Sequence, residues 1–253
     1  MAPDTLSPTL EQPEISIDQE VQRHVREAAE AAETLGDVRE EVRSRARKVI
    51  ERGQSGLGDA LERQGAEMEQ VIRGYEGVTV DDLEDGVMGN NHIGKGDSPM
   101  NISRDIVGKT EELERTLAHE SAHGEQADIA TTDEDVAVII DGEEVSSLEL
   151  LEGDAERAAA KAVDGDAAAH REGQPAEVYG SGQKKLGKII DALGEDEVES
   201  VLRKDGDRAG QIEALQGKLW KAQLERDSTG DTLGRITREA QETGHDIREL
   251  LAA

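Results

Sequence analysis

The segment TLAHESAHGEQ, residues 116–126, places His119 and His123 four positions apart with Glu120 directly after the first. In an α-helix, positions i and i+4 lie on one face about one turn apart, so both imidazoles can bind the same metal ion. A glutamate after the first histidine can take a proton from a metal-bound water. We therefore interpret His119 and His123 as candidate metal ligands and Glu120 as the candidate catalytic base.

A third protein ligand has to come from another part of the chain. No third histidine stands at the spacing of the extended motif, because Gln126 and Ile129 occupy those positions. The remaining source is an acid on a later helix, and the segment LLEGDAE supplies Glu152. Glu152 is the preferred ligand because Gly153 beside it allows close approach of a neighbouring helix. Glu149, almost one turn earlier, is the alternative.

Glu156 follows Glu152 after one helical turn and can accept the free N–H of a ligand histidine, which fixes the tautomer of that histidine. The motifs HESAH and EGDAE together resemble those of the gluzincin metallopeptidases. The segment ending at Gln126 is also similar to small metallopeptidase-like domains of toxins and of contractile or phage-type particles. The resemblance covers roughly residues 75–180. It implies a zincin-like fold, one Zn²⁺ ion, a peptide or protein substrate, and Glu120 activating a zinc-bound water.

Hydrolysis of a peptide bond places negative charge on the substrate oxygen, and a tyrosine or histidine donor usually helps to stabilise it. Tyr179 is the first candidate for this donor, and His170 lies in the same expected loop. Residues 90–93 or 100–102 are candidates for an edge strand that pairs with an extended peptide. His92 in that region is interpreted as a surface residue.

The composition argues against nucleic acid as a partner. The chain has 58 acidic and 29 basic residues, a formal net charge of −29, and the acids are spread along its whole length. DNA binding needs a basic face, and none is visible. A uniformly acidic surface is typical of proteins that work in concentrated salt, where screening removes self-repulsion. The composition resembles that of proteins from salt-loving archaea or their viruses.

The sequence predicts no membrane partner and no disulfides. The chain has no cysteine, no apolar run long enough to span a bilayer, and no signal peptide at its start. We therefore expect a soluble protein that is cytoplasmic or associated with a virion.

The expected fold class is α+β, mainly α: a zincin-like domain with a small β region and helical flanks. Helices are expected over residues 16–54 (capped by Asp18 and interrupted near Gly36), 57–72, from 103 or 105 to 129, from 146 or 147 onward, and in three or four pieces over 184–253. Strands are expected at residues 78–80, 87–88 and 100–102, with a hairpin over 136–145 that turns at Asp141-Gly142.

Three regions follow from this pattern: N-terminal arm and helices over residues 1–74, the metallopeptidase domain over 75–180, and C-terminal helices over 181–253. The helical flanks make up about half of the chain, more than catalysis requires. The alternative to an enzyme is therefore a structural or assembly protein, for instance of a virus particle, that keeps a metallopeptidase-like fold. Long helices with Ala and Leu stripes suit oligomers or docking, and the N-terminal helices also suit a docking or inhibitory prosegment.

Overall fold

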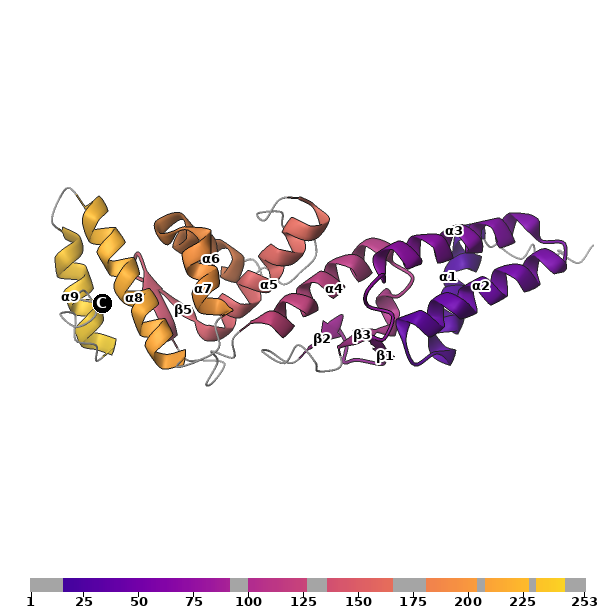
Figure 1. The fold of residues 1–253 in the computed structure, drawn as a ribbon, viewed down its shortest axis with the longest axis horizontal. Coiled ribbons are helices and arrows are strands. Elements are labelled where there is room, and N and C mark those ends of the chain that lie inside the picture. The colour runs from indigo at the N-terminus through magenta and orange to yellow at the C-terminus, as the bar shows by residue number, and fades with distance from the viewer. Residues whose placement is uncertain are drawn as a thin grey trace, which may run out of the picture. The chain divides into compact units, whose positions relative to one another are not determined.

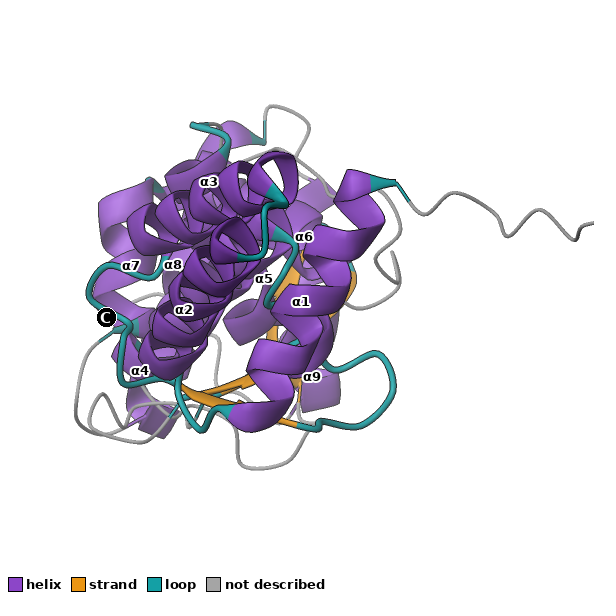
Figure 2. Ribbon diagram, turned by 90° about the vertical axis from the view of Figure 1, so that its right-hand side faces the viewer, coloured by secondary structure: helices purple, strands orange, loops and turns teal. Residues whose placement is uncertain are grey.

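A computed structural model describes residues 16–91, 100–126, 136–165, 181–203, 208–227 and 231–243. The chain divides into two compact units, Met1–Val80 and Asp81–Ala253. Helices make up most of the described chain and strands are few and short (Figures 1 and 2). The expectation of a mainly helical α+β protein is therefore confirmed. No helix among the described residues has the length and apolarity needed to cross a membrane.

The first unit is built on three helices, α1 (Ile17–Ala31), α2 (Leu35–Glu51) and α3 (Ser55–Val71). Ala, Val, Leu and Met side chains at helical spacing fill its core, in a chain that has no phenylalanine. The core side chains of these helices include Val21, Val25, Ala28, Leu35, Val38, Val42, Ala46, Leu61 and Met68.

The prediction of one long helix over residues 16–54 is wrong in two details. The break falls before Leu35, because Thr34 caps α2 by accepting a hydrogen bond from the Asp37 amide. Gly36, the expected interruption, lies inside the first turn of α2. The cap of α1 is Ser16, not Asp18, and it forms a capping box with Gln19.

The second unit begins with short strands, and β1 (Thr79–Asp81) spans the boundary between the units. Strands β2 (Gly89–Asn90) and β3 (Asn101–Ser103) are antiparallel, and β2 starts two residues later than predicted. The predicted helix from 103 or 105 is also wrong at its start. A short 3₁₀ helix, η1 (Arg104–Ile106), comes first, and α4 (Thr110–Glu125) begins only after Lys109.

The predicted hairpin is confirmed. Strands β4 (Val136–Ile140) and β5 (Glu143–Ser146) pair through a two-residue turn. Asp141 and Gly142 both have positive φ, 53° and 81°, as a turn matched to the strand twist requires. Ser146 then caps α5 (Ser147–Val163) and forms a capping box with Glu149.

In the described part of the chain after α5, four helices are present: α6 (Ser181–Leu193), α7 (Glu195–Leu202), α8 (Arg208–Arg226) and α9 (Asp231–Thr243). The hairpin and helices α5 to α8 share one apolar core of Leu, Ile and Val (Figure 1). Helices α5 and α6 cross at two glycines, and a Cβ on Gly153 would lie 2.6 Å from the carbonyl carbon of Gly182. A helix does approach closely at Gly153, but it is α6 and not the histidine-bearing α4, so the expectation is wrong about which helix Gly153 admits.

Candidate metal centre

Helices α4 and α5 pack side by side in the second unit and bring the predicted ligands together. His119 and His123 are buried on α4, and their Nε2 atoms lie 3.1 Å apart. The imidazole rings meet nearly at right angles, with an interplanar angle of 84°. The two Nε2 atoms therefore converge on one small volume, as the spacing of the histidines predicts.

The carboxylate of Glu152 on α5 borders the small volume where the two Nε2 atoms converge. Its Oε2 atom is 3.3 Å from His119 Nε2, and its Oε1 atom is 3.6 Å from His123 Nε2. The Oε2 atom is buried and has no hydrogen-bond partner among the described residues. A buried carboxylate oxygen without a donor is costly unless a cation completes its surroundings. The three residues His119, His123 and Glu152 can hold a metal ion.

Glu149, the alternative third ligand, is occupied elsewhere. Its carboxylate accepts hydrogen bonds from the Ser146 amide, the Ser181 hydroxyl and the Lys185 ammonium group. These interactions join the start of α5 to α6, so Glu149 serves helix capping and helix packing.

Glu156 lies on the Nδ1 side of His119, where the sequence predicts an acceptor for the N–H group of a ligand histidine. Its Oε2 atom is 3.4 Å from His119 Nδ1, and its Oε1 atom accepts two N–H groups of Arg115, a buried residue one turn before His119. Arg115 also donates to Asp164 at 2.6 Å. Arg115 was not identified from the sequence, although its position four residues before His119 puts it on the ligand face.

The electrostatics of the pair His119 and Glu152 reflect this close packing. Burial lowers the pKa of His119, but the carboxylates of Glu152 and Glu156 outweigh burial and raise that pKa to about 9. Burial raises the pKa of Glu152, but the two imidazoles outweigh it and bring that pKa to about 2. The site therefore stabilises positive charge strongly at the position where the three side chains meet.

Glu120 is buried beside the ligands, and its Oε2 atom has no hydrogen-bond partner among the described residues. Burial is the main cause that raises its pKa, and nearby charges on His119 and His123 oppose the rise. Strand β2 covers this residue closely: a Cβ on Gly89 would lie 2.9 Å from Glu120 Cγ. The side-chain amide of Asn91 donates to the Glu120 carbonyl at 2.7 Å. Gly89 was not identified from the sequence as part of the site, and Asn91 was included only in the candidate substrate strand of residues 90–93.

No protein-family model matches this chain, and neither a curated protein nor a solved structure matches it. The centre therefore has to be interpreted from its own geometry. Three residues considered from the sequence, Tyr179, His170 and His92, lie outside the described residues. Their roles stay predictions.

Proposed function

We propose that this chain is a zinc-dependent hydrolase of peptide bonds, related to the gluzincins and built on a zincin-like fold. The observation that carries the proposal is the convergence of His119, His123 and Glu152 within 4.8 Å of one another. Two histidines and one glutamate form a ligand set of catalytic zinc, which leaves a further position for water or substrate.

The spacing of the ligand atoms supports zinc. Two ligand atoms at about 2.0–2.1 Å from a tetrahedral ion lie about 3.3–3.4 Å apart. The two Nε2 atoms lie 3.1 Å apart, Glu152 Oε2 lies 3.3 Å from His119 Nε2, and the other oxygen, Oε1, lies 3.6 Å from His123 Nε2. With one atom from each residue, all three lie within 4.8 Å of one another. Nitrogen ligands favour zinc over magnesium or calcium, which prefer oxygen.

Bound zinc would supply a Lewis acid that polarises a carbonyl and makes a water easier to deprotonate. Glu120 is the residue that would accept this proton and pass it to the leaving amine. Burial raises the pKa of Glu120 above that of an exposed glutamate and so brings it nearer to neutral pH, as a group that both takes and gives a proton requires.

Strand β2 offers a place for the substrate. It lies directly against Glu120, and among the described residues it pairs with β3 through the register Gly89 to Ile102 and Asn90 to Asn101. We expect an extended peptide to pair with the backbone of this short strand, which would bring a peptide carbonyl toward the ligands.

The test joins metal content to cleavage. The full chain is purified without chelator, its zinc is quantified, and it is incubated with a mixed peptide library at low and at molar salt. We expect about one zinc per chain and cleavage that Glu120→Gln abolishes while the metal is retained. Glu114→Gln, an exposed position on the same helix, is the matched control and should cleave as the wild type does. Wild-type protein without stoichiometric zinc would overturn the proposal.

A second candidate function is a structural or assembly role with an inactive centre. The observation that favours it is the separate N-terminal unit, Met1–Val80, which has its own helical core and supplies none of the three ligands. Zinc binding without cleavage of any library peptide would support this role over the enzyme.

A further inference from the structure

Gln126 occupies the end of α4 and is almost completely buried, at 1% exposure. Its side-chain amide makes three contacts. The Oε1 atom lies 2.8 Å from His123 Nδ1, and the Nε2 atom donates to the Leu151 carbonyl at 2.8 Å and to Asp154 Oδ2 at 2.9 Å. Gln126 therefore joins the outer side of one candidate ligand to helix α5.

These partners fix the orientation of the amide. A glutamine side chain has one donating end and one accepting end. The Leu151 carbonyl and the Asp154 carboxylate can only accept, so the NH₂ group has to face them and Oε1 has to face His123. His123 Nδ1 then carries the proton that Oε1 accepts. In a neutral ring the lone pair is left on His123 Nε2, the atom that lies 3.1 Å from His119 Nε2.

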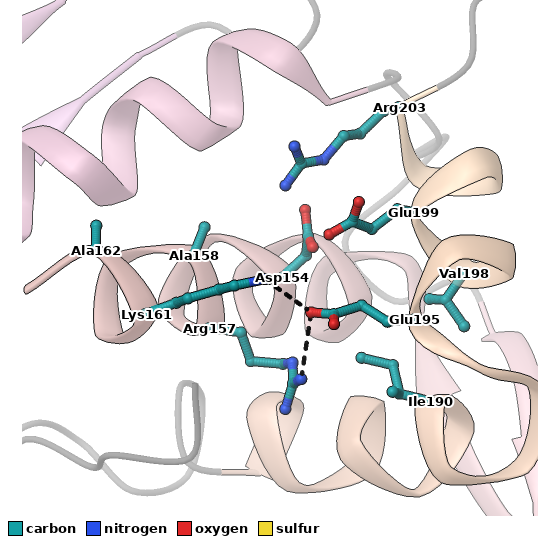
Figure 3. A pocket seen from close by; sticks show the side chains of 10 residues that line it. All are labelled: Asp154, Arg157, Ala158, Lys161, Ala162, Ile190, Glu195, Val198, Glu199 and Arg203. Carbon is teal, nitrogen blue, oxygen red and sulfur yellow. Dashed lines mark hydrogen bonds and ion pairs between the residues drawn. The ribbon is translucent and has the colours of Figure 1, made fainter. Parts of the chain in front are cut away.

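Asp154 is the charged end of this arrangement. It is 7% exposed and forms part of the wall of a pocket of about 290 Å³ between α5, α6 and α7. In Figure 3 its carboxylate lies beside the side chains of Glu199 and Arg203, whereas Arg157 points away toward Glu195. A hydrogen bond to a carboxylate is stronger than one between neutral groups, so Asp154 holds the NH₂ end of Gln126 more firmly than a carbonyl alone would.

We propose that Gln126 and Asp154 are positioning residues that hold His123 in the Nδ1–H tautomer, with Nε2 directed at the metal. This inference rests on the proposed function, since it assigns the residues that prepare one ligand of that same centre. Neither residue touches the reacting atoms. Their effect reaches the metal through the ring orientation and the basicity of His123.

Two measurements on the full chain test the proposal. The first is the nitrogen-15 chemical shift of both His123 ring atoms in metal-free protein, which distinguishes the two tautomers. The second is the zinc dissociation constant from competition with a chelator. We expect Gln126→Leu to lose the tautomer preference and to weaken zinc binding by about 10–100-fold, the usual effect of removing such a partner.

A double variant that exchanges the amide of Gln126 with the carboxylate of Asp154 separates the hydrogen-bonding role of Gln126 from its packing. Gln126→Glu alone faces the Asp154 carboxylate with a second carboxylate, and we expect zinc binding to weaken by about tenfold or more. Adding Asp154→Asn supplies an NH₂ group that can donate to the new glutamate, which still accepts from His123 Nδ1. The double variant should recover the Nδ1–H tautomer and most of the zinc affinity. The double variant also decides the matter if Gln126→Leu fails to fold.

The matched control is Gln216→Leu. Gln216 is another buried glutamine of the same unit, and its amide bonds both backbone groups of Ile139. Its loss should lower stability and leave the His123 tautomer and zinc affinity unchanged. The proposal is overturned if Gln126→Leu keeps the wild-type tautomer and affinity, or if the exchange variant binds zinc no better than Gln126→Glu. A wild type that binds no zinc refutes the proposed function instead, and the tautomer measurement still decides the role of Gln126.

Discussion

Replacing Arg115 with methionine should destabilise the second unit more than any exposed ion pair would. The Arg115 side chain is 8% exposed, and Glu156, which accepts two of its N–H groups, is 1% exposed. Removing one partner of a buried pair leaves an uncompensated charge and usually costs about 3–5 kcal/mol. Asp164, the other partner, is 32% exposed, so its loss adds less than about 1 kcal/mol.

In metal-free protein, we expect the free energy of unfolding to decrease by about 3 kcal/mol, the lower end of that range, because protonated His119 remains beside Glu156. His119 Nδ1 is 3.4 Å from Glu156 Oε2 and can carry a proton there. Adding Glu156→Gln to Arg115→Met should recover much of the loss, since a neutral amide leaves no buried charge and still accepts from His119.

The assay is urea unfolding followed by the fluorescence of Trp220, the one tryptophan of the chain, which is fully buried in the second unit. Its signal reports unfolding of that unit separately from α1 to α3. Lys188→Met is the matched control, because its bond to Glu143 is between partly exposed groups and should cost less than about 1 kcal/mol. A loss below about 1 kcal/mol for Arg115→Met, or a double variant no more stable than the single, would refute the reasoning.

Three further predictions concern glycines and pH. Gly153→Ala should lower the free energy of unfolding in urea by about 1–3 kcal/mol, because its Cβ would lie 2.6 Å from the Gly182 backbone. Gly187→Ala, where a Cβ would meet no atom, should instead stabilise α6 by about 0.5–1 kcal/mol. Gly89→Ala places a Cβ 2.9 Å from Glu120 Cγ, so peptide cleavage should fall while zinc content stays constant. In metal-free protein, His119 has a pKa of about 9 and Glu152 a pKa of about 2. The pair should therefore stabilise the folded state most between about pH 4.5 and 6.5, which urea unfolding midpoints at different pH values would measure. The contribution, about 3 kcal/mol, is lost as pH rises from 6.5 through 9 or falls from 4.5 through 2.

Local signals predicted the parts of the fold that local chemistry decides. The hairpin followed from Asp141-Gly142 between apolar runs, because a two-residue turn needs positive φ at both positions. The start of α5 followed from its serine cap, and the convergence of His119 with His123 followed from helical geometry. These features depend on residues within one or two turns of each other.

The wrong predictions and the missed residues concern helix starts and contacts between helices, which the sequence of one segment does not determine. Ser16 and Asp18 are both good caps, and the competition between them is settled by which one finds a free amide at the correct distance. Arg115 and Gly89 belong to the centre through contacts with α5 and α4, so their roles depend on tertiary packing. Gln126 was noticed only as the end of a motif, because the orientation of its amide follows from Asp154, 28 residues away.

The charges around the centre explain why a divalent ion suits it. Glu120, Glu152, Glu156 and Asp164 against Arg115 leave a formal charge of −3 at and beside the centre, four carboxylates against one guanidinium. Uncompensated buried charge is unfavourable, and a proton on His119 removes only part of it, which is consistent with the raised pKa of that residue. A bound dication would offset two of these negative charges and would give the buried oxygen of Glu152 a partner. In a chain of net charge −29, the described residues set Arg115 and the imidazoles of His119 and His123 against these carboxylates, and Arg115 is shared with Asp164, so a bound cation would add positive charge that the centre lacks.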